Sequence, residues 1–72
     1  MRVKELMKSA RGKSTSINVN EEESIDNAAI LMKNNNLSQI SVVNDDNKVV
    51  GVVTKDSILQ ASDDLNEDFF LD

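Results

Sequence analysis

The fold is decided by residues 37–59, which read LSQISVVNDDNKVVGVVTKDSIL. This stretch contains two short runs rich in valine and isoleucine, separated by the polar residues 44–47. β-Branched side chains suit a pleated, half-buried surface, so both runs predict strands. Asn and Asp bond to their own backbone and tolerate left-handed conformations, which is typical of turns. The stretch therefore predicts a β-hairpin with a loop of about four residues, followed by a helix over residues 54–61.

A strand and a helix are predicted before the hairpin. Residues 16–20 alternate polar and apolar side chains, as in a strand with one buried face. From Ser24, the expected N-cap, an apolar stripe with helical spacing runs to about Lys33. Asparagines at 34–36 should end this helix, because Asn is a poor helix former and a good left-handed cap. We expect the helix to bury four side chains, those of Ile25, Ala28, Ala29 and Met32.

The two ends of the chain have different characters. Residues 2–9 predict a short helical turn, because Val3, Leu6 and Met7 recur at i, i+3 and i+4. Residues 10–15 are small and polar and predict a loop. Residues 63–72 form an acidic tail that contains both phenylalanines of the chain. The tail could fray, or it could dock through Leu65 and Phe69, and its many apolar atoms favour docking.

The predicted fold class is α+β, with the order β-α-β-β-α after the first turn. A three-stranded sheet with two helices on one face is the simplest packing of these elements. Residues 1–62 form the expected domain. A chain of 72 residues buries only about 60% of its unfolded surface, so association with another copy, or with the rest of a longer protein, is the expected source of further stability.

Composition and charge exclude several functions. The net charge is −5, which argues against nucleic-acid binding. Residues 1–13 carry five basic side chains and one acidic one, and this arm either holds an anion or, more commonly, is simply solvated. No apolar run approaches the roughly 20 residues of a membrane span, and no signal peptide opens the chain, so we expect a cytoplasmic protein without membrane insertion. Without His, Cys, a P-loop or an evident carboxylate pair, neither a metal site nor an enzyme is expected.

The order of elements and four sequence segments resemble the cystathionine-β-synthase (CBS) domain family. These segments are residues 3–7 (VKELM), 24–32 (SIDNAAILM), 40–43 (ISVV) and 50–59 (VGVVTKDSIL). The resemblance implies a regulatory module that is not a catalyst. CBS motifs usually work in pairs, packed sheet against sheet, and bind AMP, ADP, ATP or S-adenosylmethionine in the clefts between them. Since the chain holds one motif, the resemblance implies a homodimer or higher assembly that senses energy state.

The resemblance also suggests residues that would contact the ligand. The family motif is Gly, two apolar residues, Thr or Ser, two variable residues and Asp, which Gly51 and Thr54 match, while Ser57 replaces the Asp. That Asp holds the ribose hydroxyls, and a serine would bond one of them without charge assistance. Three further residues match positions that line the adenine slot, although they are equally ordinary strand residues: Ile17, Ile40 and Val52.

A phosphate also has a physical reason to bind near Thr54. The start of the second helix presents unpaired N–H groups, the Thr54 hydroxyl can donate to a phosphate, and Lys55 adds positive charge. Alternatively, Thr54 only caps the helix. Two functions therefore remain open: a nucleotide-sensing module, or a dimerisation and scaffold domain with a CBS fold and no bound nucleotide.

Overall fold

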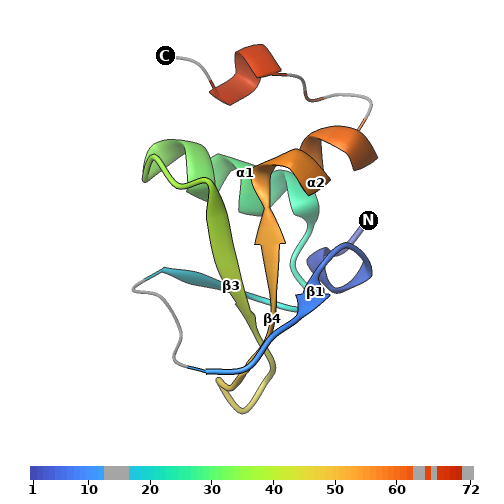
Figure 1. Cartoon of the computed structure of the whole chain (residues 1–72), viewed down its shortest axis with the longest axis vertical. Helices are drawn as coiled ribbons and strands as arrows, with labels where there is room; N and C mark the ends of the chain where they lie inside the picture. The colour runs from blue at the N-terminus through green and yellow to red at the C-terminus, as the bar shows by residue number, and fades with distance from the viewer. Residues whose placement is uncertain (13–16, 63–64, 66, 71–72) are drawn as a thin grey trace.

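A computed structural model describes residues 1–12, 17–62, 65 and 67–70 of the chain. Figure 1 shows the arrangement of the elements in space. In chain order they are the 3₁₀ helix η1 (Val3–Glu5), strands β1 (Lys8–Ser9) and β2 (Asn18–Asn20), helix α1 (Ile25–Asn34), strands β3 (Gln39–Val43) and β4 (Val49–Thr54), helix α2 (Lys55–Ala61) and the 3₁₀ helix η2 (Glu67–Phe70).

The sheet has the strand order β1-β4-β3-β2 within the described residues. β3 and β4 form the predicted antiparallel hairpin, and β2 lies parallel to β3 after the helical crossover. The α+β class is confirmed, but the sheet has a fourth strand where the sequence predicted three. Lys8 and Ser9 pair with Val52 and Gly51. Of the helical turn predicted for residues 2–9, only η1 forms. After it the backbone becomes extended and runs alongside β4.

The turn of the hairpin is held by the side chain of its first residue. Asn44 Oδ1 accepts hydrogen bonds from the N–H groups of Asp46, at 2.9 Å, and Lys48, at 3.0 Å. Asn47 is in the left-handed region, with φ of 63°. A register shift between Val42 and Val43 marks an irregularity where the strands approach the turn. The predicted turn chemistry is confirmed.

Helix α1 begins and ends as predicted. The Ser24 hydroxyl accepts a hydrogen bond from the Asn27 N–H at 3.2 Å, which makes it the N-cap. Asn35 follows as the C-cap, and Asn36 is left-handed, with φ of 58°. The helix buries the four side chains expected from its apolar stripe, Ile25, Ala28, Ala29 and Met32.

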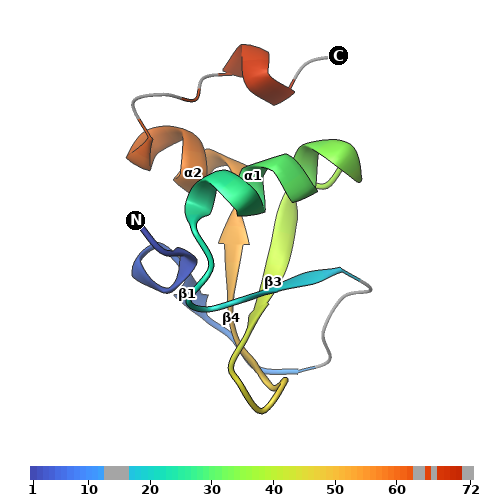
Figure 2. The ribbon, with the colours of Figure 1, turned by 180° about the vertical axis from the view of Figure 1, so that it is seen from behind.

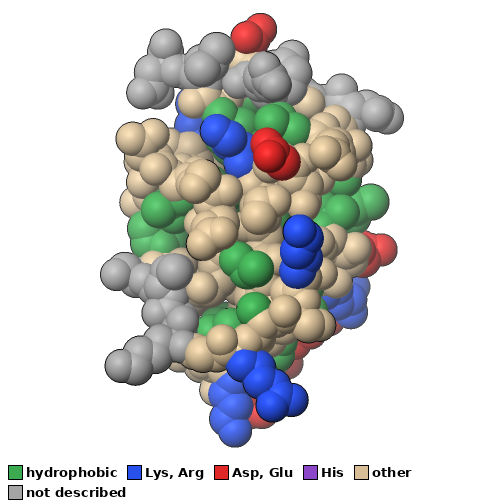
Figure 3. Space-filling model, in the orientation of Figure 1, with side chains coloured by type: hydrophobic (Ala, Val, Ile, Leu, Met, Phe, Trp, Pro, Cys, Tyr) green, Lys and Arg blue, Asp and Glu red, His purple; other side chains and the backbone are tan. Residues whose placement is uncertain are grey.

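The hydrophobic core lies between the sheet and the two helices. α1 lies behind β3 and β4 in Figure 1 and in front of them in Figure 2, so it covers one face of the sheet. Ile58 of α2 joins the same core cluster, so both helices cover this face, as predicted. The residues that form the buried cluster are Val3, Val19, Ile25, Ala28, Ala29, Met32, Ile40, Val42, Val53 and Ile58. The opposite face of the sheet is the one seen in Figure 3.

Several predicted segments extend past the described residues. Residues 13–16, which belong to the predicted loop at 10–15 and the predicted strand at 16–20, lie outside the described part. The observed strand β2 begins at Asn18. Of the predicted tail, residues 63, 64, 66, 71 and 72 lie outside it. The described tail residues are docked, because Leu65, Phe69 and Phe70 pack against the core cluster. The division of the chain at residue 62 stays a prediction.

Candidate functional site

The candidate site lies where β4 passes directly into α2. Thr54 is both the last residue of β4 and the N-cap of α2. Its Oγ1 accepts a hydrogen bond from the Ser57 N–H at 3.2 Å and donates one to Ser57 Oγ at 3.0 Å. The capping role that the sequence offered as an alternative is therefore present.

Capping does not use up the hydrogen-bonding capacity of this pair. A hydroxyl group has one donor and two acceptor lone pairs, so the Ser57 hydroxyl can still donate and each oxygen keeps acceptor capacity. Both residues are half-buried, which leaves part of each within reach of another molecule. The pair is uncharged, so it can bond to a hydroxyl group or to a phosphate oxygen without ion pairing.

Val52 lies beside this hydroxyl pair on the open face of the sheet. It is paired with Ser41 on β3 and with Lys8 on β1. Side chains alternate along a strand, and Val53 is in the core, so Val52 and Thr54 share the opposite face. Figure 3 shows that this face carries small hydrophobic patches among uncharged polar surface, with few charged groups near its centre.

One residue on this face is buried although it is polar. Ser41 is 6% exposed, whereas Val52, its cross-strand partner on β4, is half-buried. Ser41 is a small residue that is paired with Asn18 on β2 and with Val52 on β4.

The other predicted residues are placed differently. Ile40 is 0% exposed in the core, on the face of the sheet opposite Val52. Ile17 is half-buried, lies just before β2 and packs against the core cluster. Because β3 separates β2 from β4, Ile17 lies across the sheet from Thr54. The structure thus brings Val52, Thr54 and Ser57 together, and it does not bring Ile40 to that surface. The ligand roles of all six predicted residues stay predictions.

Lys55 is the cation beside the hydroxyl pair. It is the first residue of α2 and is half-buried. Its Nζ lies 5.7 Å from the centre of the Phe70 ring, in cation–π geometry. Phe70 was missed as a neighbour of the site by the sequence reasoning. The signal that could have pointed to it was the placement of both phenylalanines in an acidic tail.

Gly51, the first residue of the family-like motif, has a packing role. A Cβ at this position would lie 2.7 Å from the Lys8 carbonyl oxygen and 2.7 Å from Met7 Sδ. Glycine is therefore required because β1 and the chain before it pass close over β4. This requirement exists without any ligand.

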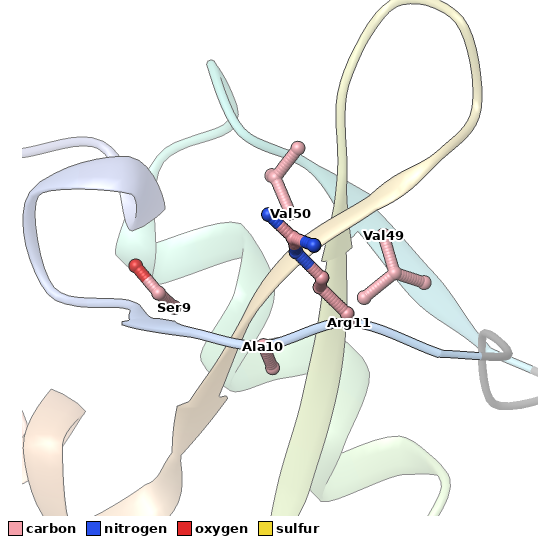
Figure 4. Close-up of a pocket in the computed structure, with 5 residues that line it drawn as sticks. All are labelled: Ser9, Ala10, Arg11, Val49 and Val50. Carbon is pink, nitrogen blue, oxygen red and sulfur yellow. The ribbon is translucent and has the colours of Figure 1, made fainter.

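A separate cavity lies toward the other end of β4. It is lined by Ser9, Ala10, Arg11, Val49 and Val50. Figure 4 shows the Arg11 side chain extending toward Val50. The lining offers one guanidinium group, one hydroxyl group and apolar surface. These residues provide no acid, base or nucleophile arrangement for catalysis.

Electrostatic effects on titratable groups are found away from the hydroxyl pair. The hydrogen bond from Lys4 holds the pKa of Glu22 below its ordinary value, and the side-chain hydrogen bond from Asn27 does the same for Glu23.

Among the residues that the structure describes, no group of three or more His, Cys, Asp or Glu side chains could hold a metal ion. Within the same residues, no helix has the length and apolar character needed to cross a lipid bilayer.

Comparison with known proteins identifies the fold. The CBS domain family model matches residues 3–64. No curated protein matches the chain. Among solved structures, the CBS domain pair of protein MJ0100, in complex with 5′-methylthioadenosine and S-adenosyl-L-methionine, is 40% identical with a TM-score of 0.59. The match covers 62% of this chain and 36% of that one.

Two further structures share this fold. The cytosolic domain of the Mg²⁺ channel MgtE in complex with ATP is 26% identical, with a TM-score of 0.61, and the match covers 64% of this chain and 18% of that one. CBSX2 in complex with AMP is 24% identical, with a TM-score of 0.59, and the match covers 62% of this chain and 33% of that one. The present chain therefore matches only part of each of these structures, as expected if each contains more than one motif.

Proposed function

Because the chain belongs to the CBS domain family, we propose that it is a regulatory module that pairs with a second CBS motif and binds an adenosyl ligand. The observation that carries the proposal is the half-buried Thr54–Ser57 hydroxyl pair, which lies at the end of β4 on the same sheet face as Val52. Related CBS structures support the ligand class, since MJ0100 was solved with S-adenosyl-L-methionine and MgtE with ATP.

Each exposed residue of the site has a role in this proposal. Val52 provides an apolar surface for adenine, whereas Ile17 packs against the core cluster on the other side of β3. Ser57 bonds one ribose hydroxyl. Thr54 donates to a phosphate or other terminal group when its proton turns from Ser57 Oγ toward the ligand. Lys55, the first residue of α2, supplies positive charge next to Thr54. Ile40 has no exposed surface in one copy of the chain, so its proposed role is to support the slot from beneath.

Pairing completes the proposed site. One copy of the chain supplies one open sheet face, and a cleft needs a second wall. MJ0100, one of the similar structures with bound adenosyl compounds, is a CBS domain pair. We expect a homodimer or a higher assembly at micromolar concentration. Sedimentation equilibrium checks this directly, and a monomer at high micromolar concentration contradicts it.

The module is proposed to sense its ligand and not to transform it. A site of two hydroxyls and one ammonium group has no general base or activated nucleophile among its described residues. A cytoplasmic location is part of the proposal, and the likeness to the cytosolic domain of MgtE supports it. AMP and ATP are the ligands that would connect the module to the energy state of the cell.

Calorimetric titration with AMP, ATP and S-adenosylmethionine tests the proposed function. Ser57→Asp restores the carboxylate of the family motif and should tighten binding of ribose-containing ligands, least for ATP, whose phosphates the new charge repels. Ser9→Asp is the matched control, because it adds the same charge on exposed β1. If Ser57→Asp gives heats indistinguishable from buffer with all three ligands, the site is not an adenosyl site.

The second candidate is a dimerisation or scaffold domain without a nucleotide. One observation favours it: the Thr54 and Ser57 hydroxyls already bond to each other, and the position of the family carboxylate holds a serine. This function predicts a stable dimer by sedimentation and no heat with any of the three ligands. The titration therefore separates the two candidates.

A further inference from the structure

The chain continues past the family match at residue 64 and folds back onto its own domain. We define the C-terminal strap as Leu65 together with η2 (Glu67–Phe70). Leu65, Phe69 and Phe70 are half-buried against the core cluster. In both Figure 1 and Figure 2, η2 lies across the helical end of the molecule, away from the hairpin turn.

Two cations hold the strap, one from each helix. Lys33 of α1 places its Nζ 4.9 Å from the centre of the Phe69 ring, and Lys55 of α2 places its Nζ 5.7 Å from that of Phe70. The two rings contact each other edge to face, with centres 5.0 Å apart and an interplanar angle of 84°. The strap therefore bridges α1 and α2 through aromatic contacts with charged groups.

The contact at Lys55 connects the strap to the candidate site. Lys55 follows Thr54 directly in the chain, as the first residue of α2. In the docked strap its ammonium group faces an aromatic ring. The strap also carries the exposed carboxylate of Asp68. An anionic group that approaches Lys55 therefore competes with Phe70 and meets negative charge on the same segment.

We propose that the C-terminal strap selects among adenosyl ligands by occupying Lys55 and disfavouring those that carry phosphates. This inference rests on the proposed function and adds the basis of its specificity. ATP must draw Lys55 from Phe70 and approach the acidic strap. S-adenosylmethionine has no phosphate, and its sulfonium and ammonium cations outweigh its one carboxylate, so the acidic strap attracts it and it depends less on Lys55. Phe70 is the specificity-determining residue, and it acts by positioning Lys55.

The docked strap can be tested without any ligand. Ring currents should shift the Lys55 Hε proton resonances upfield in the free chain, because the ammonium group lies over the Phe70 ring. Phe70→Leu keeps an apolar side chain and removes the ring, so the shift should disappear. An identical Hε resonance in wild type and Phe70→Leu would overturn the proposal. Adding ATP to the wild-type chain should reduce the shift, whereas S-adenosylmethionine should leave it.

Titration of the full-length variants tests the selection. Phe70→Leu should tighten ATP binding by roughly 3- to 10-fold, the scale of one cation–π contact, and change S-adenosylmethionine binding less than 2-fold. Phe69→Leu is the matched control, because its ring contacts Lys33 instead, and its effect on ATP should be smaller. Asp68→Asn, at an exposed position, should tighten ATP binding in the same direction even if Phe70→Leu impairs folding.

The outcomes separate the strap from the proposed function. If wild type, Phe70→Leu and Asp68→Asn bind ATP equally well, adenosyl binding stands and selection by the strap is wrong. If no variant binds ATP or S-adenosylmethionine, both are wrong. If ATP and S-adenosylmethionine gain equally in Phe70→Leu, the strap blocks the site without selecting, and the proposal fails.

Discussion

Thr54 Oγ1 lies 3.0 Å from Ser57 Oγ and also accepts the Ser57 N–H at 3.2 Å. The same threonine therefore ends a strand, caps a helix and supplies half of the candidate site. Because the α2 cap and the proposed ligand contact share one oxygen atom, stability and binding should change together when that atom is removed.

Thr54→Ala should lower both properties. Loss of the cap costs about 1 kcal/mol of unfolding free energy, and loss of a hydrogen bond to a charged phosphate costs about 1.5–3 kcal/mol of binding free energy. Urea unfolding and calorimetric titration with ATP measure the two effects. Thr54→Ser keeps the hydroxyl and should retain most of both. If Thr54→Ala loses stability but binds ATP as wild type does, Thr54 is a cap alone.

Gly51→Ala should destabilise the domain through β1. The new Cβ would lie 2.7 Å from the Lys8 carbonyl oxygen, which is backbone and cannot rotate away, and 2.7 Å from Met7 Sδ. Overpacking of this kind costs about 1–3 kcal/mol. Adding Met7→Ala removes the sulfur but not the carbonyl, so the double variant should recover only part of the loss, as a double-mutant cycle in urea would measure. An unchanged midpoint for Gly51→Ala would mean that β1 does not lie over Gly51.

Ala28→Asp should prevent stable folding. Ala28 is 0% exposed in the core, and an unpaired carboxylate there has no compensating partner. Ile30→Asp is the matched control on the same helix, because Ile30 is 47% exposed. Circular dichroism should show no cooperative thermal transition for Ala28→Asp and a transition close to wild type for Ile30→Asp. Similar transitions for the two variants would contradict the assigned buried face of α1.

Acid should weaken the contact between η1 and the turn after β2. Glu22 accepts a hydrogen bond from Lys4 Nζ at 2.8 Å and pairs with Arg2 at 3.0 Å. The Lys4 hydrogen bond holds the Glu22 pKa below its ordinary value of 4.5. A lowered folded pKa means that the stabilisation is complete above the unfolded pKa and is lost as the pH falls through the folded one.

Glu22→Gln should therefore reduce the slope of stability against pH below about pH 4.5. Thermal midpoints between pH 3 and pH 6 would measure it. Because the pair is exposed, 0.5 M NaCl should reduce the same slope in wild type. A slope that is unchanged by both the substitution and the salt would show that the pair contributes nothing to folding.

The sequence alone determined the elements whose signals are local. Hydrophobic spacing located α1 and its buried face, Ser24 and Asn36 marked its ends, and the polar residues 44–47 located the hairpin turn. These features depend on residues a few positions apart, where helix and turn chemistry operate. The same local patterns, in order, carried the resemblance to the CBS family.

The candidate site was only partly predictable for the same reason. Thr54 and Ser57 are three residues apart, so a local motif could bring them together, and the cap confirms that proximity. Ile40 and Val52 depend on the register of the hairpin. Pairing of Ile40 with Val53 places Ile40 in the core and Val52 on the opposite face. Period-2 alternation describes each strand, but the register across the turn decides which valine faces the helices.

Only the tertiary structure decided the contacts between distant segments. Three contacts join residues that are far apart in the chain. Lys8 and Ser9 pair with β4, their neighbourhood requires glycine at position 51, and the Phe70 ring contacts Lys55. No local periodicity encodes these contacts, because each is favourable only after the sheet and both helices have formed the surface that it meets. The sequence thus determined α1 with its buried face and the hairpin turn, and the packed surface decided which distant side chains reach the end of β4.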